Sequence, residues 1–374
     1  MDEASSGGGA TDQYSAAYSF SHHVRADGTL WAWGNNNNGQ LGLGDVFNRS
    51  SPVQVGSLDT WRKVGGTVAS AGAIKADGTL WTWGYGSYGQ TGHGDTTQKF
   101  SPVQVGSSTN WSAIAGGNSH MRALKTDGTL WAWGKNTAGE LGDGTLLSTS
   151  SPIQIGSNTD FVHIVNSYNS NVVHRDIAGG GGAEFEFGEA DVTILTYGRG
   201  TEQQLGDNAS LNRSSPVQLG AAGQWFNSAI MNYTGLAVKN DNTLWTWGAA
   251  ANGALGNGTT TPNKSSPIQV GSLTDWYRVV EGTSNGAALC IKTDGTLWAW
   301  GSNNIGQLGL GDVINRSSPV QVGTNTNWAR VYSGEMYTVA FTNNNKIYAW
   351  GWNTYGQLGL GDQVNRSSPV QIGY

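Results

Sequence analysis

The chain has 374 residues, and its composition points to one large repetitive domain rather than to several helical ones. Glycine provides 57 residues and charged residues only 12% of the chain, whereas typical proteins have about 7% glycine and about 25% charged residues. The 17 tryptophans exclude a disordered chain, and a net charge of -6 excludes a protein that binds nucleic acid through bulk positive charge.

The single cysteine and the first ten residues give no sign of a disulfide framework or of a signal peptide. Cys290 is the single cysteine, which excludes an intramolecular disulfide and a cysteine-based metal site and predicts a small buried side chain. Residues 1–10 are acidic and then glycine-rich, so we predict a flexible leader without the features of a classical signal peptide. No apolar run approaches the ~20 residues that span a bilayer. We therefore expect no membrane insertion and a location in the cytoplasm or in a virion.

One unit of about 50 residues occurs seven times between residues 11 and 374. Each copy carries Ser-Pro, then Val or Ile, then Gln, with its proline at Pro52, Pro102, Pro152, Pro216, Pro267, Pro319 and Pro369. An aromatic-glycine pair has the same spacing, with its glycine at Gly34, Gly84, Gly134, Gly198, Gly248, Gly301 and Gly351. These spacings indicate seven copies of one structural element.

Each unit contains signals for four strands. In the second unit, Asp77-Gly78 joins two extended runs, and this dipeptide predicts a two-residue type I′ hairpin turn. A glycine-rich connection of about 17 residues follows each aromatic-glycine pair, as after Gly34, and leads to a proline-led third run. A fourth short run begins at Trp61 in the first unit.

Seven units of four strands with no helical periodicity predict an all-β fold, a single seven-bladed β-propeller of four-stranded blades. Sixteen of the 17 tryptophans fall at two motif positions, so we expect them to fill the core between blades rather than to bind a ligand. The sequence stops before a fourth strand of the seventh unit, and residues 11–18 align with that strand. We therefore expect the N-terminal strand to close the last blade.

These units resemble the regulator of chromosome condensation repeat family. The resemblance is carried by the aromatic-glycine pair, the Pro-x-x-Val string and Gly-Gln-Leu-Gly at 39–42, 306–309 and 356–359. It implies a seven-bladed propeller. Family members include a nucleotide exchange factor for a small GTPase, secreted β-lactamase inhibitors, and bacterial and viral proteins without assigned activity, so the resemblance leaves function open.

The sequence departs from the family pattern in two ways. The family often has histidine before the first strand of a unit, but only His120 matches here. Nearly identical Asn-Arg-Ser-Ser-Pro-Val-Gln strings occur at 48–54, 212–218, 315–321 and 365–371. This near-identity is more typical of a recently duplicated microbial or phage protein than of a eukaryotic exchange factor.

No pattern in the sequence predicts catalysis or a cofactor. Residues 84–89 match G-x-G-x-x-G, but no helix-forming segment follows to provide a phosphate-binding N-terminus. The six histidines occupy mostly different repeat positions. We therefore expect a protein that is not an enzyme and has no cofactor or metal.

A series of cations lies three residues before the repeat prolines in six of the seven units: Arg49, Lys99, Arg213, Lys264, Arg316 and Arg366. One interpretation is a local ion pair with the loop acids Asp45, Asp95, Asp207, Asp312 and Asp362. The other is a ring of positive charge that binds an acidic partner. In both cases we expect the series and the Gly-Gln-Leu-Gly loops on one face, opposite the Asp-Gly turns.

The fourth unit has an insertion of 14 residues near 175–190. Its alternating acids and aromatics predict an amphipathic hairpin that binds a partner through Glu184, Phe185, Glu186, Phe187 and Glu189. The alternative is a loop without function, because hairpin tips tolerate insertions. Trp352, outside the two tryptophan positions, is a further candidate for an exposed contact residue.

Together these features predict a non-enzymatic interaction or structural propeller in a phage virion or another microbial surface assembly, with a role in attachment or decoration. Its partners would be proteins, including other virion or surface proteins, and not nucleic acid. Two alternatives stay open: an exchange-factor-like regulator of a small GTPase, and a proteinaceous enzyme inhibitor.

Overall fold

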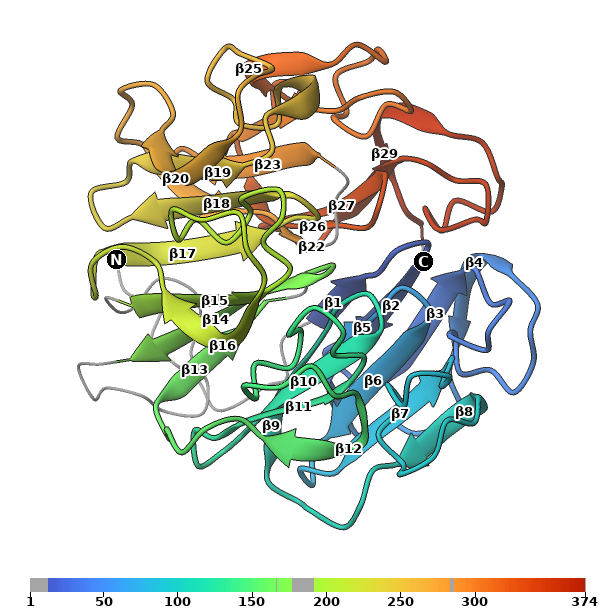
Figure 1. The fold of residues 1–374 in the computed structure, drawn as a ribbon. Coiled ribbons are helices and arrows are strands. Elements are labelled where there is room, and N and C mark those ends of the chain that lie inside the picture. The colour runs from blue at the N-terminus through green and yellow to red at the C-terminus, as the bar shows by residue number, and fades with distance from the viewer. Residues whose placement is uncertain (1–12, 166, 177–191, 283–285, 374) are drawn as a thin grey trace, which may run out of the picture.

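Seven four-stranded antiparallel blades follow one another round a ring, as the sequence predicts (Figure 1). The computed structural model describes residues 13–165, 167–176, 192–282 and 286–373. The leader predicted at residues 1–10 lies outside this range. Within it, the one helical element is the 3-10 turn η1 (Ala251–Gly253), and no helix is long and apolar enough to cross a membrane.

The first four blades are made of consecutive strands. Blade 1 contains β1 (Gln13–Ala16), β2 (Phe20–Val24), β3 (Leu30–Gly34) and β4 (Arg49–Gln54). Blade 2 contains β5 (Trp61–Gly66), β6 (Ser70–Lys75), β7 (Leu80–Gly84) and β8 (Lys99–Gln104). Blade 3 contains β9 (Trp111–Gly116), β10 (His120–Lys125), β11 (Leu130–Gly134) and β12 (Thr149–Gln154). Blade 4 contains β13 (Phe161–Ile164), β14 (Ser170–Asp176), β15 (Val192–Gly198) and β16 (Arg213–Gln218).

The last three blades repeat this order. Blade 5 contains β17 (Trp225–Ile230), β18 (Thr234–Lys239), β19 (Leu244–Gly248) and β20 (Lys264–Gln269). Blade 6 contains β21 (Trp276–Val279), β23 (Ala287–Lys292), β24 (Leu297–Gly301) and β25 (Arg316–Gln321). Blade 7 contains β26 (Trp328–Ser333), β27 (Tyr337–Thr342), β28 (Ile347–Gly351) and β29 (Arg366–Gln371), and the short β22 (Glu281–Gly282) pairs with β26 in parallel.

The predicted closure by the N-terminal strand is not confirmed, because the blades begin at a different strand from the sequence units. The run from Trp61 is the first strand of blade 2 and pairs with β6, rather than ending the blade before it. In the same way β1 pairs with β2 and completes blade 1, while blade 7 has four strands of its own. Three residues, 67–69, join the first two strands of blade 2, whereas six residues, 55–60, separate blade 1 from blade 2.

The Asp-Gly hairpins have three-residue loops and not the predicted two-residue type I′ turns. In blade 1 the N–H of Arg25 bonds to the carbonyl of Thr29 at 3.0 Å, and the N–H of Gly28 bonds to the carbonyl of Arg25 at 2.8 Å. Only Gly28 has a positive φ, of 81°, whereas type I′ needs two such residues. The Asp27 carboxylate instead accepts hydrogen bonds from the N–H and hydroxyl of Thr29, at 3.0 and 2.6 Å. Asn242 and Asn345 take the glycine position in blades 5 and 7.

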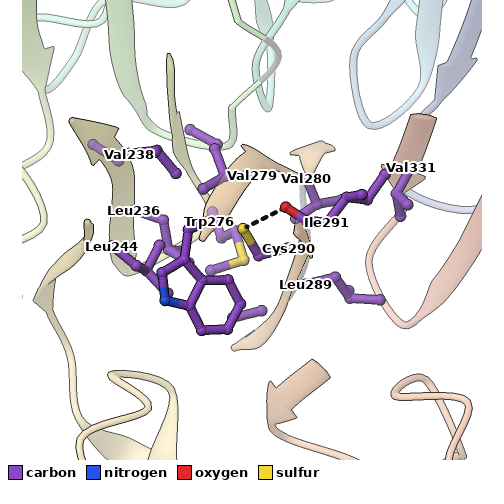
Figure 2. Packing of buried hydrophobic residues seen from close by; sticks show 14 of the residues in the cluster. Leu236, Val238, Leu244, Trp276, Val279, Val280, Leu289, Cys290, Ile291 and Val331 are labelled. Carbon is purple, nitrogen blue, oxygen red and sulfur yellow. Dashed lines mark hydrogen bonds between the residues drawn. The ribbon is translucent and has the colours of Figure 1, made fainter. Parts of the chain in front are cut away.

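Tryptophans pack between the blades, which confirms the predicted core role for eleven of the sixteen, whereas Trp31, Trp81, Trp131, Trp245 and Trp298 are only partly buried. The second tryptophan of the third strand is fully buried, and the tryptophan that begins the first strand is nearly so, at 1–5% exposure. Figure 2 shows part of the largest cluster, in which Leu236 and Leu244 of blade 5 meet Trp276 and Cys290 of blade 6. Cys290 is 1% exposed, as predicted for a small buried side chain.

A repeated hydrogen bond connects six of the seven blades with the loop of the blade before it, the exception being blade 4, where Tyr197 replaces the tryptophan. The indole N–H of Trp83 donates to the carbonyl of Gln40 at 2.9 Å, and Trp133, Trp247, Trp300 and Trp350 make the same bond to the preceding loop. Trp33 donates to the carbonyl of Gln357 at 3.0 Å, which joins blade 7 to blade 1. The ring is therefore closed by the contact that also joins its other blades.

This closure can be tested by replacing Trp33 with Phe. The change removes the shorter of the two hydrogen bonds to the buried carbonyl of Gln357 and leaves only that from the Ser21 hydroxyl, at 3.4 Å, which costs about 1–3 kcal/mol. The matched variant is Trp133→Phe, which removes the same bond between blades 2 and 3. We expect urea unfolding to give both variants the same loss of stability, and a Trp33→Phe loss well below that of Trp133→Phe would contradict the closed ring.

Three buried histidines predict that stability falls in mild acid. Burial lowers the pKa of His22 and His120 to about 3 and that of His174 to about 4, from an ordinary value of 6.5. As pH falls below 6.5, the unfolded chain binds protons that the folded chain does not, so the free energy of unfolding decreases. Each histidine contributes a loss of about 1–2 kcal/mol between pH 7 and pH 5.

The variant that isolates one of these groups is His22→Leu, because Leu236 and Leu289 occupy the same register position in blades 5 and 6. Urea unfolding at pH 7 and pH 5 should show a smaller pH-dependent loss in the variant than in the wild type. Equal losses in the two proteins would show that His22 does not carry this effect.

Candidate partner-binding face

The strand register assigns the connections to two opposite faces. In blade 1, Gly34 at the end of β3 pairs with Phe20 at the start of β2 and with Arg49 at the start of β4. The loop between the third and fourth strands and the turn between the first and second strands therefore lie on one face, which we name the long-loop face. The Asp-Gly turns lie at the other strand ends, on the hairpin face. This arrangement agrees with the faces expected from the sequence.

The cation series lies on the long-loop face, and most of its members form the predicted local ion pairs. Each cation begins the fourth strand of its blade. Five pairs join it to the loop acids: Arg49–Asp45 at 2.6 Å, Lys99–Asp95 at 3.1 Å, Arg213–Asp207 at 2.6 Å, Arg316–Asp312 at 2.5 Å and Arg366–Asp362 at 2.6 Å. Lys264 forms no ion pair within the described ranges, because Thr259 stands where blades 1, 2, 6 and 7 have Asp45, Asp95, Asp312 and Asp362.

These ion pairs are part of a small network that holds the loop backbone. The N–H of Ile314 and the guanidinium of Arg316 hold the pKa of Asp312 below its usual value, against the opposing effect of desolvation. Arg316 also donates to the carbonyl of Ile314 at 2.6 Å. The same three bonds recur at Asp362, Val364 and Arg366. The cations therefore act first on their own loops, and the geometry gives little support to a free positive ring.

The residues held by this network are exposed apolar side chains that the sequence analysis did not identify. We name them the rim tips: Phe47 at 69% exposure, Leu147 at 75%, Ile314 at 62% and Val364 at 60%. They occupy equivalent loop positions in blades 1, 3, 6 and 7. Leu211, in the differently shaped loop of blade 4, is 62% exposed. Apolar side chains that are both exposed and grouped on one face are typical of interaction surfaces.

A buried asparagine fixes the loop in the four blades that have rim tips. Asn36, Asn136, Asn303 and Asn353 are all 0% exposed. The amide of Asn303 donates to the carbonyl of Ile314 at 3.1 Å and accepts the N–H of Leu308 at 3.0 Å, so it spans the loop. The other three blades have Gly86, Gly200 and Ala250 at this position. In the sequence, these tips can be recognised by two features of one loop: the string Gly-x-Asn at its start and an apolar residue eleven positions after the asparagine.

At the centre of the same face lie the turns between first and second strands, because the first strands are the innermost. Tyr18 of blade 1 and Tyr168 of blade 4 stack with ring centroids 6.4 Å apart, so they meet across the axis. The Tyr18 hydroxyl donates to the Glu335 carboxylate of blade 7. Burial raises the pKa of Glu335 above its ordinary value.

Trp352 borders this centre and is less exposed than the sequence analysis suggested. Its indole N–H donates to Thr354 at 2.7 Å, and its ring lies edge-on to Tyr355 at 5.3 Å. Its backbone N–H bonds to the carbonyl of Met336, the residue after Glu335, at 2.9 Å. The side chain is therefore half-buried in the wall of the central turns.

The candidate residues Glu184, Phe185, Glu186, Phe187 and Glu189 lie outside the described residues. The strands before and after the insertion, β14 and β15, pair as far as Asp176 opposite Val192. The insertion therefore joins the second and third strands of blade 4, at the place of an Asp-Gly turn, as the sequence indicates. A role of these five residues in binding stays a prediction.

The hairpin face has a second cation series, which the sequence analysis missed. In blade 2, Lys75 lies over the rings of Trp81 and Trp61, at 3.6 and 5.0 Å from their centroids. Lys125, Lys239 and Lys292 repeat this arrangement in blades 3, 5 and 6. These contacts cover the ends of the tryptophan core and account for the basic residue before each Asp-Gly turn.

The described part of the chain contains no group of three or more His, Cys, Asp or Glu that could hold a metal ion. A shallow groove of about 400 Å³ lies on the hairpin face between blades 6 and 7, beside Tyr277, Lys292 and Trp328. The lining also includes Thr293, Asp294 and Asn343. The long-loop face is thus the more developed candidate surface.

Comparisons with known proteins agree with this architecture. The model of the regulator of chromosome condensation (RCC1) repeat matches more than half of the chain, at residues 27–67, 77–124, 127–173, 241–289, 294–341 and 344–374. The chain is 34% identical over 119 residues to the human "Probable E3 ubiquitin-protein ligase HERC3". This alignment covers 31% of the chain and 11% of HERC3. The chain therefore corresponds to a small part of that relative.

Solved structures show the same fold at low sequence identity. Human WBSCR16 superposes with a TM-score of 0.78 and 19% identity, over 92% of this chain and 94% of that chain. Prp20p from Saccharomyces cerevisiae superposes with a TM-score of 0.75 and 16% identity, over 92% of this chain and 85% of that chain. Because the repeat model matches more than half of its length, the chain belongs to the regulator of chromosome condensation (RCC1) repeat family.

Proposed function

We propose that this protein is a non-enzymatic interaction propeller that binds a protein partner through its long-loop face. The observation that carries the proposal is the set of rim tips. Four aliphatic or aromatic side chains are at least 60% exposed, yet their backbones are fixed by buried asparagines and, in three blades, by ion pairs. A loop whose backbone is ordered before binding loses less conformational entropy when a partner covers it.

The rim tips are arranged to suit an extended partner surface rather than a small ligand. Blades 6, 7 and 1 are consecutive in the ring and each supplies one tip, whereas Leu147 lies apart on blade 3. The threonines of blade 2, with Thr97 at the equivalent position, interrupt the apolar set. One side of the rim is therefore the most apolar, and this asymmetry gives the partner a preferred orientation on a nearly symmetric body.

For the setting, we propose a virion or another microbial surface assembly. The low charge content and the nearly identical Asn-Arg-Ser-Ser-Pro-Val-Gln strings of four units support it. Proteomic analysis of purified virions and surface fractions from the source organism is the direct test. Recovery only from the soluble cytoplasmic fraction would contradict this setting.

The alternative is an exchange-factor-like regulator of a small GTPase. It is supported by the likeness to Prp20p, whose structure is described with its binding properties to Gsp1p and histones. At 16% identity this likeness concerns the fold, and a shared propeller does not carry function with it. Accelerated release of labelled GDP from a small GTPase of the source organism would favour this alternative over a structural role.

The rim tips predict which variants lose the partner. We expect the triple variant Phe47→Ser, Ile314→Ser, Val364→Ser to fold normally, because the three side chains are exposed. Removing three apolar anchors from an interface should weaken binding at least tenfold. The measurement is affinity capture from lysate of the source organism with quantitative mass spectrometry, followed by a binding isotherm for the protein enriched by the wild type.

The matched control is Leu58→Ser, Leu273→Ser, which removes exposed leucines from the hairpin face, at 46% and 49% exposure. This control should retain the partner that the triple variant loses. Loss of the partner by the control, together with retention by the triple variant, would place the interface on the hairpin face and overturn the proposal.

A further inference from the structure

The centre of the long-loop face contains a carboxylate that lacks a cation. Glu335 is partly buried, and among the described residues no Lys or Arg forms an ion pair with it. Its recorded partner is the Tyr18 hydroxyl, which donates to it. A partly buried carboxylate with one neutral donor retains acceptor capacity for a charged group.

Two tyrosine rings, Tyr18 and Tyr168, lie near this carboxylate, and a third, Tyr233, lies near Tyr168. Tyr18 and Tyr168 stack across the axis at 6.4 Å, and Tyr233 of blade 5 occupies the corresponding turn next to that of blade 4. All three are partly exposed, as is Glu335. We name these four residues the axial cluster. The faces of tyrosine rings attract cations, and a nearby carboxylate adds a direct charge interaction.

The backbone holds the axial cluster in place. The N–H of Glu335 bonds to the carbonyl of Tyr18 at 3.1 Å, between blades 7 and 1. The N–H of Asn118 bonds to the carbonyl of Tyr168 at 2.6 Å, between blades 3 and 4. The turns are therefore linked to one another as well as to their own blades. A site with this support can bind a side chain without first becoming ordered.

The protein itself shows that a guanidinium fits at this tyrosine surface. Arg199 of blade 4 lies over the ring of Tyr233, 5.5 Å from its centroid, and its Nε donates to the Thr201 hydroxyl at 2.9 Å. Arg199 is thus held on Tyr233, close to Tyr168, and does not form an ion pair with Glu335. A second guanidinium can stack on Tyr18 or Tyr168 and direct its N–H groups to Glu335.

We propose that the axial cluster binds an arginine side chain of the protein partner. Arginine fits better than lysine, because its planar group can stack on a ring while it donates two parallel hydrogen bonds to a carboxylate. The inference rests on the proposed function, since it assumes a partner on the long-loop face. It adds the chemistry of the central contact: the rim tips give apolar contacts at the edge, and Glu335 selects a cation at the axis.

The test uses two synthetic peptides and does not need the natural partner. One is acetyl-Gly-Ser-Arg-Ser-Gly-amide, and the other carries citrulline, which has the shape of arginine without its charge. Saturation-transfer NMR with the full chain should show binding of the arginine peptide at least fivefold tighter than the citrulline peptide. Equal binding of the two peptides, or no binding of the arginine peptide, would overturn the inference.

Variants identify the residues responsible. Glu335→Gln keeps the side-chain size and should reduce binding of the arginine peptide at least fivefold, to the level of the citrulline peptide. Tyr168→Leu should also weaken binding, whereas Tyr168→Phe, which keeps the ring, should restore it. The control Glu202→Gln removes an acid from the blade 4 loop of the same face, outside the axial cluster, and should leave binding unchanged. Unchanged binding by a folded Glu335→Gln protein contradicts the proposed role.

The outcomes for this inference and for the proposed function are separable. The triple rim variant should bind the arginine peptide like the wild type, because its three substitutions lie at the rim. If the rim variant loses the partner but Glu335→Gln keeps full affinity for both partner and peptide, the axial site is wrong and the docking face stands. If the peptide binds through Glu335 but the rim variant keeps the partner, the axial site stands and the rim contact is wrong.

Discussion

The hydrogen bond from a buried indole N–H to the loop of the preceding blade is the interaction on which the ring depends. A buried indole donor without an acceptor is costly, so the loop must present a carbonyl at that point. Gln40 provides the carbonyl, and the neighbouring Leu41 is fully buried. Gly42 must be glycine, since a Cβ there would lie 2.8 Å from Nε1 of Trp83. The Gly-Gln-Leu-Gly string is therefore a contact between blades and not a ligand site.

This contact also explains why the long loops can serve as a rigid binding surface. Each loop is attached to the next blade by a backbone bond such as that from Gly44 to the carbonyl of Phe100, at 2.9 Å, and six of the seven loops are also attached by the indole bond. A glycine-rich connection would otherwise cost much conformational entropy to order. The bonds to the next blade already order the loop, so the side chains that follow them in the loop can vary without loss of the loop structure. The position two residues before the fourth strand shows this variation, with Phe47, Thr97 and Leu147 in blades 1, 2 and 3.

The sequence predicted the fold class and the blade number because a period of about 50 residues repeats the whole tryptophan and glycine pattern. It did not predict where a blade begins, since a cyclic pattern can be divided at any strand. That choice depends on the lengths of the connections. Three residues, 67–69, join β5 to β6, whereas six residues, 55–60, lie between β4 and β5. The hairpin type was missed for a local reason, because the Asp27 side chain binds Thr29 and keeps its own φ negative.

The candidate site residues also differ in how far the sequence could predict their contacts. The ion pair of Arg316 with Asp312 was predictable because both residues lie in one loop, four positions apart. Tyr18, Tyr168 and Glu335 were not, since their shared position, two residues before the second strand of the blade, varies among the repeats and the three side chains come together only when the ring closes. Arg122 illustrates the same limit, as a fully buried guanidinium that donates to the carbonyls of Val165 and Val172 in the next blade. The repeats thus define the body of the propeller, whereas residues that break the repeat define its binding surface. In a ring of near-identical blades, only such residues can distinguish one orientation of a partner from the other six.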